Sequence, residues 1–289
     1  MSSVTDRRLR FPHVLDGPAC VHPGSVFDPM SARIAEELGF EVGMYAGSTA
    51  SLTVLGAPDL IVLTLSEFAQ QARRICRAVH TLPVLVDADH GYGNALNAMR
   101  TVEELENAGV AAMTLEDTVL PRPHGDGRVT LVSLEEGLGK VRAALAARDD
   151  PSFVIVARSG VVSVNGVEDA VARTKAYTES GADALFYTGI RTRAELDAVA
   201  AVATRPIILG GIEGTELKDR DYLAARGVRI ALQGHQPIMA AQQAVYNTLK
   251  ALREGVQPAD LPGLPSAEFM GRITRDADYK RRTKQFLKG

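Results

Sequence analysis

The pentapeptide Asp87-Ala88-Asp89-His90-Gly91 directly follows an apolar run at residues 82–86. The run is short, rich in valine and leucine, and lacks polar alternation, which is typical of a strand buried on both faces. Carboxylates at the end of such a strand lose hydration unless they are paired or bind a metal ion. Oxygen ligands favour a hard divalent cation, with Mg²⁺ as the first candidate and Mn²⁺ as the alternative. Asp87 and Asp89 are therefore candidate metal ligands, and the competing interpretation is a polar turn.

Further polar side chains stand where other apolar runs end. The second run ends in Gly47-Ser48-Thr49, small residues whose backbone N–H groups can bind a carboxylate or a phosphate. The fourth run ends in Glu116, the fifth ends in Arg158, and the eighth leads into His235. Acids, one guanidinium and one imidazole together predict a site for a small polyanion. The alternatives are an ion pair between Arg158 and a neighbouring acid, and a structural role for His235.

The elements that carry these residues alternate regularly along the chain. Thr64 and Ser133 each begin a helix with a hydroxyl–carboxylate capping box. Four helices end at a glycine that precedes an apolar strand, as expected for a left-handed helix end: Gly39, Gly109, Gly181 and Gly227. Eight strands are expected, at residues 18–21, 42–46, 84–87, 111–116, 153–158, 184–188, 206–209 and 229–232.

This alternation predicts an α/β fold, a (β/α)8 TIM barrel whose active-site residues lie at the C-terminal ends of the strands. A doubly wound open sheet is the competing fold, and it usually carries a glycine-rich phosphate loop after its first strand. The segment after the first run, residues 22–29, has no such pattern. The barrel is therefore favoured.

The length and composition indicate one barrel with an extension. The chain has 289 residues, 46% hydrophobic and 23% charged, and such barrels typically take about 250 residues. Residues 255–265 form a linker rich in proline and glycine, which a helix cannot cross. We expect a barrel domain over residues 1–254 and a linker with a C-terminal helical tail over residues 255–289. The tail packs either on a neighbouring subunit or back on its own barrel.

Charge and cysteine content exclude several classes of protein. The net charge of −3 gives no basic field for nucleic acid. No apolar run approaches the roughly 20 residues that span a bilayer, and the first residues lack the apolar core of a secretion signal. Cys20 and Cys76 lie far apart in the sequence and form no metal-binding spacing. We therefore expect a cytoplasmic protein without nucleic-acid or membrane partners.

Four motifs together resemble the isocitrate lyase/phosphoenolpyruvate mutase superfamily. They lie at residues 25–29 with Ala32, at 56–59, at 87–93 and at 115–117, and the resemblance extends from about residue 20 to residue 250. Within the superfamily, the oxaloacetate decarboxylase branch is the closest in pattern. The resemblance implies an α/β barrel that binds Mg²⁺ and a small keto acid. It also implies a homotetramer, built as a dimer of dimers, in which subunits often exchange the last helix.

The same resemblance implies roles for the acids. Asp87 corresponds to the principal metal carboxylate. Asp89 and Glu116 would hold metal-bound water or complete the outer shell of ligands. Asp59 corresponds to an acid near the metal.

The resemblance also implies the residues that touch the substrate. Ser48, with the neighbouring amides that include Thr49, would bind the carboxylate of the keto acid, and Arg158 would close on the same end. His235 matches the position that distinguishes the decarboxylase branch and would contact the substrate. Arg158 and His235 are thus the candidate catalytic residues.

The sequence departs from other branches after the fourth strand. Lyases of the superfamily carry a loop with lysine and a catalytic cysteine there, whereas this chain has Pro-Arg-Pro-His-Gly-Asp at residues 121–126. It also lacks the asparagine-containing loop of the phosphonopyruvate enzymes. His124 is most simply an exposed loop residue, and Lys140 and Lys175 fall in expected helices away from the strand ends, so no Schiff-base lysine is expected.

These departures favour Mg²⁺-dependent decarboxylation of oxaloacetate to pyruvate and CO₂ through a metal-stabilised enolate. Two alternatives stay open. One is a C–C bond lyase or hydrolase that acts on another 2-keto or 2-hydroxy acid, such as a substituted malate or phosphonopyruvate. The other is a barrel that binds a dicarboxylate without turning it over.

Overall fold

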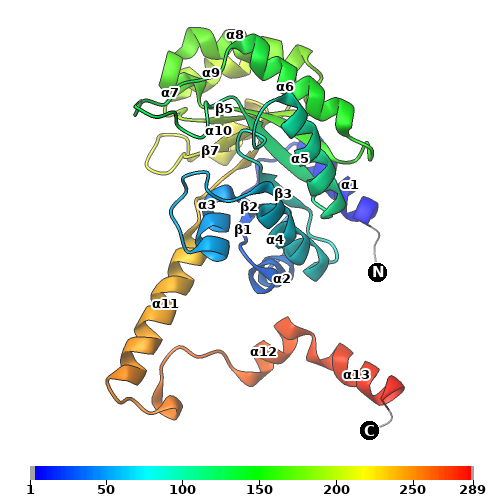
Figure 1. The fold of residues 1–289 in the computed structure, drawn as a ribbon, viewed down its shortest axis with the longest axis vertical. Helices are drawn as coiled ribbons and strands as arrows, with labels where there is room; N and C mark the ends of the chain where they lie inside the picture. The colour runs from blue at the N-terminus through cyan, green and yellow to red at the C-terminus, as the bar shows by residue number, and fades with distance from the viewer. Residues whose placement is uncertain (1–3, 126, 288–289) are drawn as a thin grey trace. The chain divides into compact units, whose positions relative to one another are not determined.

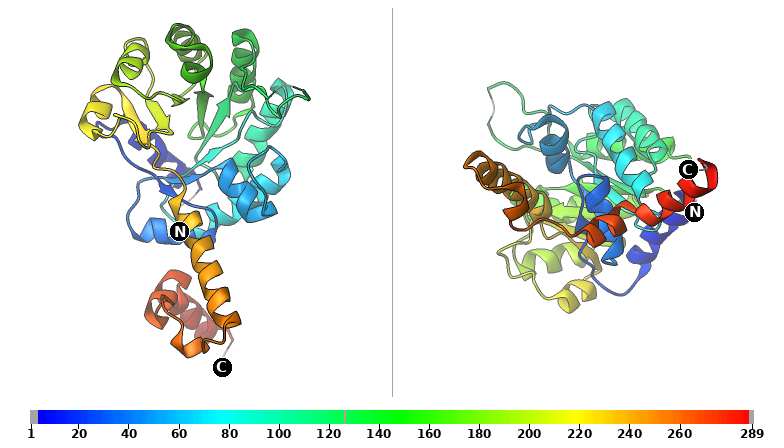
Figure 2. Two further views of the ribbon diagram at one scale, coloured as in Figure 1. Left: turned by 90° about the vertical axis from the view of Figure 1, so that its left-hand side faces the viewer. Right: turned by 90° about the horizontal axis from the view of Figure 1, so that it is seen from below.

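The computed structural model describes residues 4–125 and 127–287. Eight parallel strands follow one another in chain order around a single curled sheet, and helices lie outside them (Figures 1 and 2). The strands are β1 (Gly24–Ser25), β2 (Gly43–Tyr45), β3 (Val84–Asp87), β4 (Ala112–Glu116), β5 (Val154–Ser159), β6 (Ala184–Thr188), β7 (Ile207–Gly210) and β8 (Val228–Ala231). A parallel bridge between Val21 and Ile230 joins the chain before β1 to β8. The predicted (β/α)8 barrel is confirmed.

The first predicted strand is wrong, whereas the other seven lie within one residue of their predicted bounds. Of residues 18–21, only Val21 pairs, and Pro18 has no N–H group to donate. The chain runs alongside β2 three residues later, where the Gly24 amide donates to Val42 O at 2.9 Å. The ladder therefore begins at Gly24.

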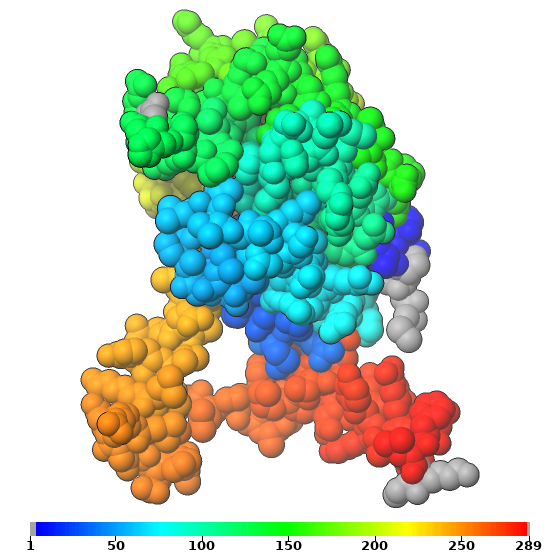
Figure 3. Space-filling model, in the orientation of Figure 1, coloured from blue at the N-terminus to red at the C-terminus, as the bar shows by residue number. Residues whose placement is uncertain are grey.

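The helices of the first unit connect these strands. They are α1 (Val4–Asp16), α2 (Pro29–Glu37), α3 (Gly47–Ala50), a π-helical turn η1 (Ser51–Leu55), α4 (Leu65–Ala78), α5 (Ala95–Asn107), α6 (Leu134–Ala147), α7 (Val161–Asn165), α8 (Val167–Glu179), α9 (Arg193–Ala200) and α10 (Arg220–Ala225). On the face drawn in Figure 3, the blue-to-cyan segments that include α4 and α5 lie side by side, in agreement with their contacts.

The predicted helix ends are also found. Thr64 and Glu67 form a capping box at the start of α4, and the Ser133 hydroxyl accepts from the Glu136 amide at the start of α6. The four predicted turn glycines all have positive φ, between 77° and 94°. These local interactions place each strand start directly after a helix end.

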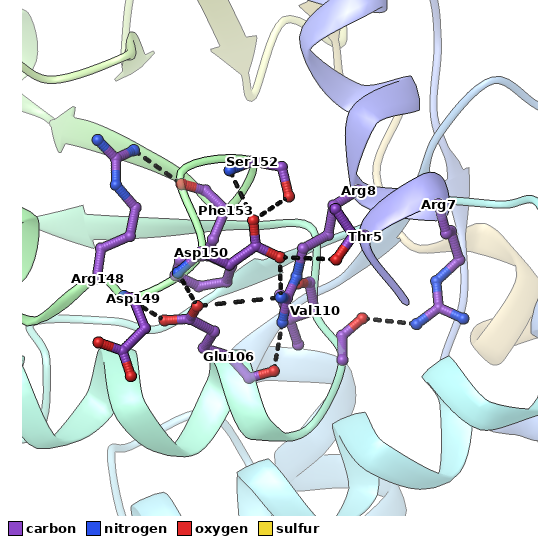
Figure 4. Close-up of polar contacts among 11 residues, drawn as sticks. Thr5, Arg7, Arg8, Glu106, Val110, Arg148, Asp149, Asp150, Ser152 and Phe153 are labelled. Atoms are coloured by element: carbon purple, nitrogen blue, oxygen red, sulfur yellow. Dashed lines mark hydrogen bonds and ion pairs between the residues drawn. The ribbon is translucent and has the colours of Figure 1, made fainter. Parts of the chain in front are cut away.

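Helix α1 covers the N-terminal ends of the strands. Its Phe11 and Leu15 are buried among the apolar side chains that fill the barrel interior. Arg7 donates to Gly109 O at 2.8 Å and Arg8 to Val110 O at 2.7 Å, just before β4, and Figure 4 shows this cluster. Arg8 also forms an ion pair with Asp150 at 2.7 Å. Charged groups are rarely buried without partners, and these bonds supply the partners of Arg7 and Arg8. They fix α1 at the end of the barrel opposite to Asp87 and Glu116, which end β3 and β4.

The second compact unit comprises residues 235–287 of the described chain. It contains α11 (Gln236–Arg253), a 3-10 turn η2 (Pro258–Asp260) in the linker, α12 (Ala267–Thr274) and α13 (Asp276–Phe286). The Ser266 hydroxyl caps α12 by accepting from the Phe269 amide at 3.1 Å. The domain boundary at residues 254–255 and the exchange of the tail between subunits stay predictions. Among the described residues, no helix has both the length and the apolar composition needed to cross a membrane.

Candidate active site

The C-terminal ends of three neighbouring strands carry the central residues. Strand β3 ends at Asp87, β4 ends at Glu116, and Arg158 lies one residue before the end of β5. The ladder pairs Asp87 with Thr114 and Glu116 with Arg158. Because residues i and i+2 of a strand share a face, all four side chains lie on the same side of the sheet. Strand register alone therefore gathers these groups.

A cavity of about 380 Å³ lies over these strand ends. It brings together the predicted residues Asp59, Asp87, Asp89, Glu116 and Arg158. The rest of its lining comes from two loops, with residues Leu60, Ile61, Thr118, Val119, Leu120, Pro121, Arg122 and Val129. The cavity thus combines an acidic part with one buried guanidinium and a largely apolar wall.

Arg158 neutralises two of the acids. Its Nη1 forms a short ion pair with Asp87 Oδ2, and its Nε lies 3.4 Å from Glu116 Oε2. The guanidinium also stands 5.3 Å from the ring centroid of Phe186. Although burial disfavours the charged form, Asp87 and Glu116 hold the pKa of Arg158 above its ordinary value. The ion-pair interpretation therefore describes Arg158 as it stands in this structure.

Hydrogen bonds fix the Asp87 carboxylate, and the local backbone and the space above Gly47 position Asp89. The Thr114 hydroxyl donates to Asp87 Oδ1 at 2.9 Å, and the Asp89 amide donates to the same oxygen at 3.2 Å. Asp89 itself has a φ of 48°, which is uncommon for a residue with a side chain. A Cβ on Gly47 would lie 3.0 Å from Asp89 Oδ1, so the absent side chain gives the carboxylate its room. Such strained backbone is often concentrated at functional sites.

The acids repel one another. Burial raises the pKa of Asp89 well above its ordinary value, and the charges of Asp87, Glu116 and Asp59 raise it further. Burial likewise raises the pKa of Glu116, against the opposing effect of Arg158. The cavity therefore holds more acidic groups than its one buried cation can balance, and this excess favours the protonated forms of Asp89 and Glu116.

The donor set fits a hard divalent cation, because its groups are carboxylate oxygens whose mutual repulsion a cation would relieve. Within residues 4–125 and 127–287, no three His, Cys, Asp or Glu side chains already form a cluster poised to hold a metal. Asp87 instead forms an ion pair with Arg158, and the backbone amide of Asp89 donates to Asp87. Metal binding at Asp87, Asp89 and Glu116 stays a prediction.

Two predicted substrate residues, Ser48 and Thr49, are not among the residues that line the cavity. Thr49 is fully buried, and its hydroxyl donates to Ala46 O at 2.8 Å within the turn that begins α3. Ser48 is partly buried in the same short helix. His235, the third predicted substrate residue, is the first residue of the second unit. Their roles, and those of Asp59 and Arg158, stay predictions.

The loop after β4 supplies a wall that the sequence did not reveal. Residues 118–122 and 129 line the cavity, together with Leu60 and Ile61 from the loop after η1. Ile61 has a φ of 58°, an outlier for a β-branched residue. The sequence signal was the apolar run Val119-Leu120-Pro121, which begins two residues after Asp117. Asp126, which belongs to the same loop, lies outside the described residues.

Potential nucleophiles lie elsewhere. Both cysteines are free and buried, and burial raises the pKa of each thiol to about 11. Lys140 is buried on α6, and burial lowers its pKa against the opposing charges of Glu136, Glu116 and Asp117. Neither it nor any cysteine is among the residues that line the cavity.

A family model for phosphoenolpyruvate phosphomutase matches residues 17–253. The chain belongs to the phosphoenolpyruvate phosphomutase family. A family relative from Bradyrhizobium sp. (strain BTAi1 / ATCC BAA-1182), named oxaloacetate decarboxylase, is 58% identical over 274 residues, which cover 95% of this chain and 94% of the relative.

Two solved structures of similar fold belong to enzymes that are named for small keto acids. Phosphonopyruvate hydrolase in complex with oxalate and Mg²⁺ has a TM-score of 0.85 and 29% identity, over 97% of this chain and 99% of that one. Oxaloacetate acetylhydrolase with 3,3-difluorooxalacetate has a TM-score of 0.84 and 29% identity, over 97% of this chain and 96% of that one. The expected superfamily is confirmed.

Proposed function

We propose that this protein is a Mg²⁺-dependent oxaloacetate decarboxylase that forms pyruvate and CO₂. Relatives that are 54–58% identical over nearly the whole chain carry that name. The observation that carries the proposal is the composition of the cavity: carboxylates and a buried arginine, with no thiol or amine among the described lining residues. Decarboxylation of a β-keto acid needs no protein nucleophile.

The reaction breaks one carbon–carbon bond. The bond between C3 and C4 of oxaloacetate breaks, C4 leaves as CO₂, and the electron pair moves toward the C2 carbonyl oxygen to give the enolate of pyruvate. A proton then adds to C3. Arg158, the buried cation of the cavity, would hold the C1 carboxylate together with the amides at Ser48 and Thr49. His235 would orient the substrate or deliver the proton.

Asp87, Asp89 and Glu116 would hold the cation, with Asp59 nearby. A bound Mg²⁺ supplies a Lewis acid that stabilises negative charge developing on the keto oxygen. Mn²⁺ has similar oxygen-ligand chemistry and is the alternative. Mg²⁺ is present in the structure of the related phosphonopyruvate hydrolase, which supports this choice.

The apolar wall supports loss of CO₂ over tight binding of the second carboxylate. Strong pairing of the departing carboxylate would stabilise the ground state more than the transition state. Leu60, Ile61, Val119 and Leu120 contribute apolar lining to the cavity. A carboxylate placed against them loses hydration, which favours its conversion to neutral CO₂.

The test measures oxaloacetate loss coupled to pyruvate detection, with Mg²⁺ present and again with a chelator. A blank with metal alone is essential, because free Mg²⁺ promotes this decarboxylation. Pyruvate formation well above the blank, abolished by the chelator and restored by Mg²⁺ or Mn²⁺, is the expected result. No excess over the blank would refute the proposal.

A second candidate is cleavage or hydrolysis of another 2-keto or 2-hydroxy acid, favoured by the fold shared with phosphonopyruvate hydrolase and oxaloacetate acetylhydrolase. Faster turnover of phosphonopyruvate or a substituted malate than of oxaloacetate would support it. Thermal stabilisation by oxalate without any turnover would instead indicate a barrel that only binds dicarboxylates.

The assembly and compartment follow as further proposals. A homotetramer is supported by exposed apolar side chains on α11, where Met239, Tyr246 and Leu249 are 61%, 64% and 61% exposed. Light scattering on the purified chain would test it, and a monomer would refute it. Two free, buried cysteines fit a reducing compartment such as the cytoplasm.

A further inference from the structure

Asp117, the residue after Glu116, connects the two strand ends that carry Glu116 and Arg158. Its side chain is 2% exposed, and its Oδ2 accepts hydrogen bonds from Ser159 Oγ at 3.0 Å, Arg173 Nη1 at 2.9 Å and the Tyr177 hydroxyl at 2.9 Å. Its backbone amide donates to Arg158 O at 3.3 Å. Asp117 therefore fixes the end of β4 against the end of β5.

Arg173 reaches this point from outside the barrel. It lies on α8, is 5% exposed, and donates through Nη2 to Val132 O at 3.0 Å in addition to its bond with Asp117. Its Nε bonds Asp169 on the surface of the same helix at 3.1 Å. One guanidinium thus contacts residue 117 and residue 132, the two ends of the loop that walls the cavity.

The loop ends are also paired with each other. The Val132 amide donates to Asp117 O at 2.8 Å, the Val119 amide donates to Thr130 O at 2.9 Å, and Thr118 bridges Leu131. Residues 118–122 and 129, between these ends, line the cavity. The position of this wall over the carboxylates therefore depends on the two paired ends of the loop, and Arg173 bonds both of them.

A gain in stability is a weak reason for such an arrangement. Replacing a buried ion pair with apolar groups of similar volume is often neutral or stabilising. A planar guanidinium, however, presents several donors in a fixed fork, so that it can orient two acceptors at once. Lysine keeps the charge but not this geometry.

We propose that Arg173 is a positioning residue: through Asp117 and Val132 it holds the loop residues 118–122 and 129–131, and the adjoining ends of β4 and β5, in the geometry that decarboxylation requires. It touches no substrate. The inference rests on the proposed function and extends it to a residue on an outer helix. Displacements of about 1 Å at a reacting site can cost about a hundredfold in rate.

Four variants separate positioning from stability. Arg173→Met removes the bonds to both loop ends, and Arg173→Lys keeps the charge. Tyr177→Phe removes one donor to Asp117 while leaving Arg173 in place. Asp169→Asn is the matched control: it removes the ion pair that Arg173 makes on the helix surface and alters the bond from Asn165 to the same carboxylate, but leaves the bonds of Arg173 to both loop ends.

Two readouts are needed. The first is kcat and KM for oxaloacetate per folded enzyme at saturating Mg²⁺, with the Mg²⁺ half-saturation measured separately. The second is the rate of trypsin cleavage after Arg128, an exposed loop residue. Arg122 is followed by Pro123 and does not give a competing cut. The cleavage assay needs no turnover, so it measures loop anchoring even if the wild-type protein proves not to be a decarboxylase.

For Arg173→Met we expect kcat to fall by about tenfold to a hundredfold and cleavage to rise by about tenfold. The Mg²⁺ half-saturation should change less than kcat, because Asp87 and Asp89 lie outside the elements that Arg173 contacts, and only Glu116 stands on the end of β4 beside Asp117. Arg173→Lys should recover part of kcat, Tyr177→Phe should show a smaller loss, and Asp169→Asn should match the wild type.

Unchanged cleavage and kcat in Arg173→Met would overturn the inference. So would losses of kcat that disappear when rates are divided by the folded fraction. If Arg173→Met fails to fold, Arg173→Lys and Tyr177→Phe decide the question, since wild-type cleavage and kcat in both would equally overturn it.

Discussion

Replacing Thr114 with valine removes one hydroxyl group from strand β4. Thr114 is fully buried, and its Oγ1 donates to Asp87 Oδ1 at 2.9 Å. Valine has a similar branched shape, so the main change is the loss of this donor. If Asp87 is the principal metal carboxylate, its orientation should depend on that hydroxyl.

The size of the effect follows from the partners that Asp87 keeps. Asp87 Oδ1 still accepts from the Asp89 amide at 3.2 Å, and Oδ2 keeps its ion pair with Arg158. The variant therefore loses one hydrogen bond to a charged acceptor, worth about 1.5–3 kcal/mol. At about 1.36 kcal/mol per factor of ten, metal affinity or kcat/KM should fall by about 10- to 150-fold. This range agrees with the roughly 10- to 100-fold cost of removing a group that orients a metal ligand.

The assay is a Mg²⁺ titration of pyruvate formation at fixed oxaloacetate, with the metal-only blank subtracted. Thr174→Val is a matched control: Thr174 is also fully buried, and its hydroxyl bonds Ala170 O at 2.6 Å and the Tyr187 hydroxyl at 2.7 Å, neither of which is a proposed metal carboxylate. A Thr114→Val protein with wild-type Mg²⁺ half-saturation and kcat/KM would refute the assigned role of Asp87.

Three further outcomes are expected. Asp87→Ala should abolish metal-dependent pyruvate formation while circular dichroism shows an intact fold, and full activity would contradict the metal assignment. His235→Gln should lower kcat with less effect on Mg²⁺ binding, and an unchanged kcat would leave His235 with a structural role. Although burial opposes the shift, hydrogen bonds from Ser152 and Arg8 lower the pKa of Asp150 from 3.8 to about 2. Its contribution to stability is therefore present above pH 3.8 and lost as the pH falls through about 2, so denaturant titrations should show that the deficit of Asp150→Asn at pH 7 disappears across this interval.

The fold could be predicted because the signals that begin and end its helices and strands are local. A capping residue, a left-handed glycine and a short apolar run each act within a few residues, and β3 and β6 have the predicted bounds. Strand β1 could not be placed because two residues form it. Its position depends on where the chain meets β2, and the run at 18–21 is more apolar than Gly24–Ser25 itself.

The acids of the site were predictable because they follow buried strands directly. The cavity wall and the bonds of Arg173 to its loop could not be predicted, since they depend on how that loop and the outer helix α8 pack. Arg173 did carry a clue: it shares the buried face of α8 with Ala170, Thr174 and Tyr177. A charged residue on the apolar stripe of a helix needs a buried partner, but the sequence alone does not identify Asp117 as that partner.

Strand register explains why the site is both gathered and strained. The pairings Asp87–Thr114 and Glu116–Arg158 place alternate residues of three strands on one face, and a slip of one residue would turn each side chain to the other face. The strands therefore have little freedom to adjust the distances between the charges. Adjustment falls to the loops that follow them, where Asp89 and Ile61 have positive φ beside the cavity. Because that strain is local and lies outside the ladders, substitutions in these loops should alter the chemistry of the site with little effect on the barrel.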